Sequence, residues 1–228
     1  MSINIVNKVD DLVKIKNVLV SVSDKNGLDI FIPKLVEMNP EIKIFSTGGT
    51  FGKIKDILGH NWKSTLMQVS EYTGQPETQG GLVKTLDFKI YLGLLTETYN
   101  DSHQEDLSRT NAVPIDMVVV NLYPFKETIS KQDVTPEKAR GNIDIGGPCM
   151  IRASAKNFLR VASVVNPKDY NQIIMELEAH CGCTTLEMRF KLACKAFEHT
   201  SIYDSTIAQF LGSQPFSNVD ACYKIMNR

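Results

Sequence analysis

The chain has 228 residues, of which 43% are hydrophobic and 22% charged, and its formal net charge is −1. This length and composition predict one globular domain, 1–228, with a core at about 15–212. The near-neutral balance excludes a global basic field, so neither nucleic acid nor a membrane surface is an expected partner. No apolar run is long enough to cross a bilayer, and 1–16 lacks the apolar core of a signal peptide. Five scattered cysteines argue against a disulfide framework and favour a reducing, cytoplasmic location.

Short β-branched runs alternate with helical patterns over the first two thirds of the chain. In chain order we expect a strand at 17–22, a helix at 28–38, a strand at 42–45 and a helix at 51–58. Two further strands are expected at 116–122 and 161–165. The segment at 116–122 contains the fully apolar run MVVV, and 161–165 is a similar run; such runs are typical of strands covered on both faces. The alternation predicts right-handed crossovers and a three-layer α/β fold, with a mostly parallel sheet and helices on both faces.

The last third of the chain has helical spacing. Helices are expected at 168–179 and 185–210, the second with its apolar residues on one face. They predict a C-terminal helical layer on the α/β core, followed by a polar and loose tail at 213–228, apart from a short piece at 219–226.

Two junctions between a predicted strand and a predicted helix carry hydroxyls and glycines, SVSDKNG at 21–27 and FSTGGT at 45–50. In a parallel sheet both lie at the C-terminal edge, where ligands of open α/β sheets bind. Free N–H groups and the dipole at a helix N-terminus favour an anion such as phosphate, and Lys25 adds a positive charge. The alternative is that these residues only cap helices and form turns. Neither loop has a Walker or dinucleotide fingerprint, so neither ATP nor NAD is predicted.

Four further residues are candidates for proton transfer. Lys84 follows paired glycines, Tyr123 follows a strand, and Asp144 precedes Pro148, which suits the start of a helix that carries Lys156. If they converge on one cleft, they can transfer protons without a metal or a cofactor, because a dry pocket or nearby cations lower the pKa of a lysine. The alternative is two solvated surface lysines and a helix-capping aspartate.

A histidine and two cysteines lie close together at 180–183. No second ligand pair at zinc spacing accompanies them, so we expect no metal there, only a helix-ending loop with Gly182 at its C-cap. His199 lies on an apolar helix face and is predicted to be a packed core histidine.

A set of short motifs resembles one known family. The motifs, in chain order, are SVSDK at 21–25, STGGT at 46–50, VKTL at 83–86, NLYPF at 121–125, NIDIGG at 142–147, AKN at 155–157 and KAFEHT at 195–200 with Tyr203 and Asp204 after it. Together they resemble the cyclohydrolase domain of the bifunctional purine biosynthesis protein, AICAR formyltransferase/IMP cyclohydrolase. That resemblance implies a methylglyoxal synthase-like fold.

The resemblance also implies a reaction, the closure of 5-formamidoimidazole-4-carboxamide ribotide to IMP with loss of water, without cofactor or metal. The residues it implies as catalytic are Lys156, as donor or acceptor of the key proton, with Lys84, Asp144 and Tyr123. The implied phosphate contacts are Ser23, Lys25, Thr47, Gly48, Gly49 and Thr50, and Asp24 is implied as a substrate contact. The other implied substrate contacts are Leu82, Val83, Thr85, Val120, Asn121, Ile145, Gly146 and Gly147.

The chain departs from the family pattern in two places. Leu82 stands where the family usually has arginine, and Asp87-Phe88 stands where it has His-Pro. An aspartate beside Lys84 is expected to raise the pKa of that lysine and to weaken phosphate binding. The family's formyltransferase domain is also absent from the 228 residues, so the chain is expected to be either a single-activity enzyme or a piece cut from a longer protein. Residues 213–228 do not resemble the family's interdomain sequence, which favours a naturally short chain whose substrate comes from a separate formyltransferase. The resemblance further implies a homodimer.

Two rival functions remain at this point. One is a methylglyoxal synthase-like lyase, against which the motifs around Asn121 and Asp144 argue. The other is a non-catalytic nucleotide-binding regulatory module of the same fold. The candidate set Lys84, Tyr123, Asp144 and Lys156 argues against it, and Leu82 and Asp87 argue for it.

Overall fold

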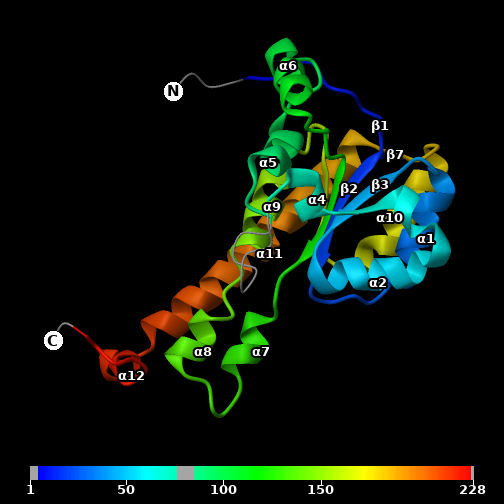
Figure 1. The fold of residues 1–228 in the computed structure, drawn as a ribbon. Helices are drawn as coiled ribbons and strands as arrows, with labels where there is room; N and C mark the ends of the chain where they lie inside the picture. Colours follow the sequence, from blue (N-terminus) through cyan, green and yellow to red (C-terminus); the bar gives the residue numbers. More distant parts are fainter. Residues whose placement is uncertain (1–4, 76–84, 227–228) are drawn as a thin grey trace.

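A computed structural model describes residues 5–75 and 85–226. At its centre lies a five-stranded, wholly parallel sheet with the order β4-β3-β2-β5-β6. Its strands are β2 (Asn17–Val22), β3 (Lys43–Ser46), β4 (Leu66–Gln68), β5 (Met117–Asn121) and β6 (Ala162–Val164). Figure 1 shows the sheet between two groups of helices.

The strands bury side chains on both faces because successive residues of a strand point to opposite sides. Val18 and Val20 of β2 belong to one hydrophobic core, whereas Leu19 between them belongs to the other. Met117 and Val118 of β5 divide in the same way. The continuous apolar runs are therefore explained by two covered faces.

The helices form the two outer layers. On one face lie α1 (Leu28–Met38), α2 (Gly48–Leu58) and α10 (Tyr170–Ala179). On the other face lie α5 (Phe88–Leu95) and α9 (Gly146–Lys156), with α11 (Leu186–Gly212) packed on α9 and on the edge strand β6. The predicted three-layer α/β fold is confirmed. The two long C-terminal helices are laid on this core, with α10 packed on α1 and α11 on α9.

The order of the strands places a topological switch point between β2 and β5. After β2 the chain runs outward through β3 and β4, then returns to pair β5 with the other side of β2. Ligands of open α/β sheets bind where the connections diverge in this way, at the C-terminal ends of the strands. The loops after β2 and β5 therefore meet at the expected binding position.

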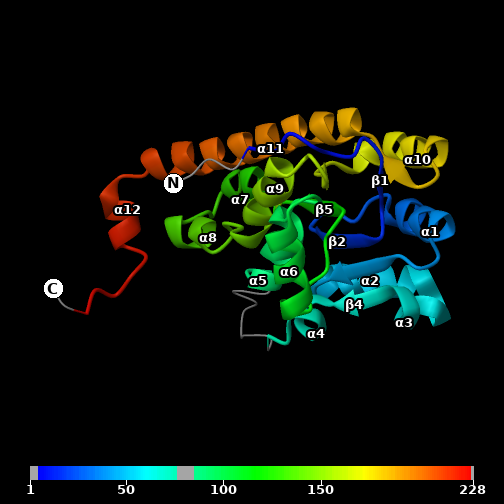
Figure 2. The ribbon, with the colours of Figure 1, turned by 90° about the horizontal axis from the view of Figure 1, so that it is seen from above.

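Short elements complete the chain. A two-stranded antiparallel sheet joins β1 (Val13–Lys14) to β7 (Cys183–Thr184). The remaining short elements are η1 (Gly59–Asn61), α3 (Trp62–Thr65), α4 (Val69–Thr73), α6 (Asp101–Thr110), α7 (Phe125–Ile129), α8 (Pro136–Arg140), η3 (Pro167–Asp169) and α12 (Phe216–Asp220). Figure 2 shows α11 running past α9 towards α7, α8 and α12. None of the described helices is long and apolar enough to cross a membrane.

Several boundaries differ from those expected. The helix predicted from residue 51 begins at Gly48, so the Gly-Gly-Thr sequence is its first turn and not a loop before it. The helix expected to open at Pro148 begins at Gly146. The tail, expected to be loose, contains α12. At 180–183, α10 has its C-cap at His180, two residues before the predicted Gly182, and the N–H of Gly182 donates to the carbonyl of Leu177.

A fully buried arginine of α11 joins four parts of the chain. The guanidinium of Arg189 donates to the carbonyls of Asp10 and Asp11, of Phe158 and Leu159, and of Thr184, over 2.6–3.1 Å. Apolar neighbours could not donate hydrogen bonds to these carbonyls, and a buried acceptor without a donor lowers the stability of the folded state.

We expect Arg189→Leu to lower the free energy of unfolding by about 3 kcal/mol, because several buried carbonyls lose a charged donor. The measurement is urea unfolding followed by circular dichroism. Lys191→Leu is the control, since the exposed ion pair of Lys191 with Glu187 is worth less than about 1 kcal/mol. Equal losses in the two variants would contradict the prediction.

Candidate active site

A cleft of about 360 Å³ lies at the switch point between β2 and β5. We call it the switch-point cleft. It is lined by the strand ends and by the helix starts that follow them: Ser21, Val22, Ser23, Lys25, Thr47, Gly48, Gly49, Thr50, Thr85, Leu86, Asn121, Tyr123, Asp144, Gly146, Gly147 and Met150. Its volume lies in the range of small-molecule pockets, roughly 300–1,000 Å³.

One wall of the cleft is built to attract an anion. It is formed by the first turn of α2, where the leading N–H groups have no partner within the helix and Thr47 supplies no side-chain cap. The Cε of Lys25 lies 3.9 Å from the Cβ position of Gly49, so the lysine stem is beside that turn. Thr50 ties the turn to β2, since its hydroxyl accepts from the N–H of Val22 at 3.1 Å and donates to the carbonyl of the same residue at 3.0 Å.

The amide of Asn121 joins the loops on the two sides of the switch point. Its Oδ1 accepts from the N–H groups of Ser23, at 2.7 Å, and Asp24, at 2.8 Å, and its Nδ2 donates to the carbonyl of Asp24 at 2.9 Å. Three hydrogen bonds from the end of β5 therefore shape the loop after β2. Asp24 itself is exposed, and its Oδ1 accepts from the N–H of Asn26, so its side chain stabilises the turn and does not line the cleft.

Asn121→Ala removes all three bonds at once. We expect the free energy of unfolding to fall by about 1 kcal/mol and the affinity for inorganic phosphate to fall roughly tenfold, because two N–H groups lose their acceptor and the loop loses its shape. The measurement is a phosphate titration followed by NMR chemical shifts. Asn142→Ala is the control, since that amide donates to Lys138 outside the cleft. Wild-type phosphate affinity in Asn121→Ala would contradict this account.

The opposite wall carries a carboxylate at the start of α9. Asp144 Oδ1 accepts from the N–H of Gly147 at 2.9 Å. Burial raises the pKa of Asp144 above its ordinary value, and hydrogen bonds from the N–H groups of Gly147 and Tyr123 oppose that shift. The packing needs glycine at two positions, because a Cβ at Gly146 would lie 2.6 Å from Thr85 Oγ1 and one at Gly147 2.6 Å from Asp144 Oδ2.

Tyr123 lies at the mouth of the cleft, where its side chain is 60% exposed. Its backbone N–H is hydrogen-bonded to Asp144 and lowers the pKa of that carboxyl, so the end of β5 and the start of α9 meet here. The cleft thus combines a cation and free N–H groups at the start of α2 with a carboxyl group at the start of α9, and Tyr123 also lines it.

The raised pKa of Asp144 predicts a pH dependence of stability. A carboxyl whose pKa is higher in the folded state stabilises the fold when protonated, and this contribution is lost as pH rises from the unfolded value, about 3.9, through the folded pKa. Asp144→Asn keeps an acceptor for Gly147 but does not titrate. We therefore expect the free energy of unfolding of wild type minus that of Asp144→Asn to fall as pH rises, in urea titrations from about pH 4 to 7. A difference that stays flat or rises would contradict it.

Some implied site residues do not line the cleft. Lys156 is exposed on the last turn of α9, ten residues and therefore about 15 Å along the helix from Gly146. Lys156 therefore does not line the switch-point cleft with Asp144 and Tyr123, and its part in proton transfer stays a prediction. The side chain of Val120 is buried in the core beneath α9, and that of Ile145 is exposed outside the cleft. Leu82, Val83 and Lys84 lie outside the described residues.

Asp87 has a local structural role. It is buried, and its side chain accepts from the N–H of Lys89 at 2.8 Å as the N-cap of α5. Asp87 does not line the cleft. Leu86 and Met150 also line the cleft, although neither was among the implied substrate contacts. Leu86 is the last residue of the VKTL motif, and Met150 lies one helical turn after Gly147 in α9.

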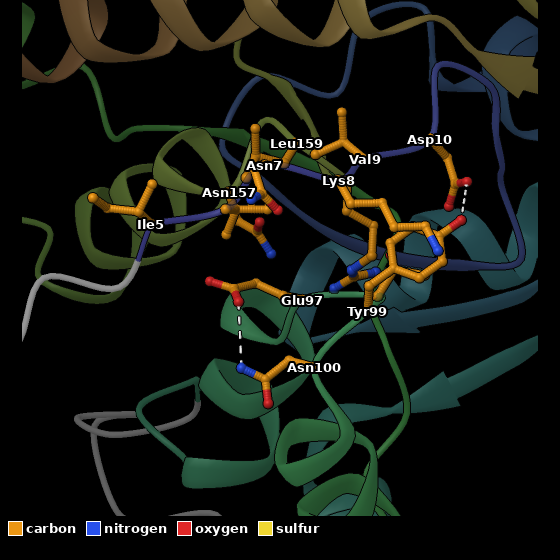
Figure 3. A pocket seen from close by; sticks show the side chains of 13 residues that line it. Ile5, Asn7, Lys8, Val9, Asp10, Glu97, Tyr99, Asn100, Asn157 and Leu159 are labelled. Carbon is orange, nitrogen blue, oxygen red and sulfur yellow. Dashed lines mark hydrogen bonds between the residues drawn. The ribbon is translucent and has the colours of Figure 1, made fainter.

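The structure has a second cavity, of about 280 Å³, whose lining side chains are shown in Figure 3. It is lined by residues 5–10, 97–100, 157, 159 and 160. Many of its polar groups are paired: Tyr99 donates to Asp10 at 2.6 Å, and Arg160 forms a buried ion pair with Asp116. Among the described residues, no group of three or more His, Cys, Asp or Glu side chains is placed to hold a metal ion. The switch-point cleft is therefore the candidate active site.

The fold and the cleft define a class of protein. Residues 27–149 match the MGS-like domain, and the chain belongs to that family. Residues 154–227 match the AICARFT/IMPCHase bienzyme family. A crystal structure of ForH superposes with a TM-score of 0.72 at 28% identity, covering 86% of this chain and 99% of ForH.

Comparison with curated relatives identifies the proteins to which the sequence is similar. The chain is 49% identical over 196 residues to the bifunctional purine biosynthesis protein PurH of Thermoanaerobacter sp. (strain X514). It is 45% identical over 197 residues to PurH of Bacillus subtilis (strain 168). Each match covers 86% of this chain and 37% of the relative, so the chain matches little more than a third of their length. The resemblance drawn from the motifs is confirmed.

Proposed function

We propose that this chain is an IMP cyclohydrolase that closes the ring of 5-formamidoimidazole-4-carboxamide ribotide. The observation that carries the proposal is the switch-point cleft, in which an anion-attracting wall is opposed by Asp144 and Tyr123. The likeness to PurH relatives supports a place in purine biosynthesis. The alternative is a nucleotide-binding regulatory module with the same cleft and no turnover.

The phosphate of the substrate suits the wall made by Lys25 and the first turn of α2. A cation and free N–H groups at a helix N-terminus both favour a phosphate. Binding the phosphate there directs the rest of the nucleotide along the cleft towards Asp144. Holding the carboxamide and formyl groups of one molecule in contact promotes ring closure, because a near-attack pose replaces random encounters.

The chemistry requires proton transfers. The carboxamide nitrogen attacks the formyl carbon and forms a C–N bond. The carboxamide nitrogen then loses one of its two protons and the formamido nitrogen loses its only one. The formyl oxygen leaves with these two protons as water, and a C=N bond remains between the formyl carbon and the formamido nitrogen. Asp144 is our candidate to accept a proton, since a carboxyl group with a raised pKa is closer to neutral pH and is a better base. Tyr123 is our candidate to donate to the departing oxygen, because it carries a phenol and lines the same cleft as Asp144.

Asp144→Asn tests this assignment. We expect kcat to fall about a hundredfold or more, because general acid–base groups contribute roughly 10²–10⁴-fold, with little change in the affinity for IMP. The measurement is the absorbance of IMP formed from the formamido ribotide. Asp133→Asn is the control, since Asp133 is exposed and pairs with Lys138 away from the cleft. An unchanged kcat in Asp144→Asn would refute its role. Tight IMP binding without turnover in wild type would favour the regulatory module.

The family resemblance implies that Lys156 transfers the key proton, yet Lys156 does not line the cleft of a single chain. If a single chain forms the whole site, Lys156→Ala should keep its turnover within about threefold of wild type, given the ~15 Å along α9. A loss of a hundredfold would show that Lys156 reaches the reacting atoms in the working enzyme. A homodimer and a separate formyltransferase that supplies the substrate are further proposals, carried by the family resemblance. Light scattering at micromolar concentration tests the homodimer.

A further inference from the structure

A tyrosine of the long helix α11 is hydrogen-bonded to the loop that carries Asp144. The hydroxyl of Tyr203 accepts from the backbone N–H of Asp144 at 2.7 Å, across 59 positions of the sequence. Tyr203 is only 8% exposed, and it does not line the switch-point cleft. It therefore contacts the main chain of a candidate catalytic residue from outside the cleft.

The ring of Tyr203 is held by its neighbours. It packs against Phe125 of α7 in an edge-on arrangement with 6.2 Å between ring centroids, and Phe125 packs in the same way on Phe210 at 6.0 Å. Phe125 is almost fully buried. The phenol oxygen is thus presented to Asp144 from a packed aromatic group and not from a mobile surface side chain.

Asp144 is restrained at two points that belong to different elements. Its backbone N–H is bound by Tyr203 of α11, and its carboxylate is bound by the N–H of Gly147 in α9. The space around the carboxylate is also narrow, as the 2.6 Å from Oδ2 to a Cβ position at Gly147 shows. With both ends restrained, the carboxylate has little freedom to rotate away from the cleft.

Burial raises the pKa of Tyr203; the hydrogen bond from the Asp144 N–H opposes this shift, and the charges of Asp144 and Asp204 add to it. The phenol therefore keeps its proton at neutral pH and adds no second negative charge beside Asp144. A phenylalanine would preserve the packing on Phe125 but would leave the Asp144 N–H without its acceptor.

We propose that Tyr203 is a positioning residue, which fixes the backbone of Asp144 so that its carboxylate faces the reacting atoms. This inference rests on the proposed function of Asp144 in ring closure. It assigns to α11 a role in the chemistry that the lining of the cleft does not reveal.

The variant that tests it is Tyr203→Phe, with Tyr72→Phe as a matched control. The hydroxyl of Tyr72 also accepts a backbone N–H, that of Val113 at 2.8 Å, and its ring also packs on a phenylalanine, Phe45, at 4.6 Å. Neither Tyr72 nor Val113 lines the switch-point cleft. The two substitutions therefore remove the same kind of hydrogen bond, but only one of them is next to Asp144.

Two readouts are measured on each protein. The first is kcat and KM for the formamido ribotide; we expect kcat to fall roughly tenfold in Tyr203→Phe with KM within twofold, because misplacing a catalytic group slows the chemical step. The second is the titration midpoint of the Asp144 carboxyl, followed by carbon NMR. We expect it to move towards the ordinary aspartate value in Tyr203→Phe, since a released loop admits water. Tyr72→Phe should leave both readouts at their wild-type values.

An Asp144 titration that is the same in Tyr203→Phe and wild type would overturn the proposal, whatever happens to kcat. Equal losses of kcat in the two tyrosine variants would overturn it too, because they would report general destabilisation. If wild type shows no turnover, the proposed function fails, yet the carboxyl titration still decides whether Tyr203 positions Asp144.

Discussion

The amide of Asn121 connects the two halves of the sheet at the place where the cleft opens. β2 and β5 are neighbours in the sheet, but 94 residues separate the end of one from the start of the other, so no local contact holds their loops together. Oδ1 and Nδ2 of Asn121 satisfy two N–H groups and one carbonyl of the loop after β2. Backbone groups at strand ends lose their ladder partners and must bond elsewhere. Here the same bonds hold together the two loops after β2 and β5, both of which line the cleft.

The helix α11 supports the molecule at several places along its length. Near its start, Arg189 binds carbonyls from three other segments, and α11 covers the edge strand β6, which would otherwise present unpaired backbone groups. Further along, Tyr203 binds the loop of Asp144 and packs on Phe125. One helix therefore contributes both to the stability of the edge and to the geometry of the candidate site.

The sequence alone predicted the elements with strong patterns and missed the weak ones. Long apolar runs such as the one around Val118 identified the buried strands, because a strand covered on both faces has no polar side. β4 has only three residues and α5 is apolar on most sides, so neither shows a clear period. The start of α2 at Gly48 was also missed, because Gly-Gly-Thr is typical of a turn and becomes helical here by its contact with β2.

The local sequence pattern determined the class of fold and the helix starts that attract an anion. The motifs determined the family. They did so because periodicity, glycines and hydroxyls act over a few neighbouring residues. Only the tertiary structure decided that Asp144 shares a cleft with Lys25, that Lys156 lies at the far end of α9, and that Asp87 is used as a helix cap. Those outcomes depend on the rise of a helix and on hydrogen bonds between residues up to a hundred positions apart, and no short segment contains that information.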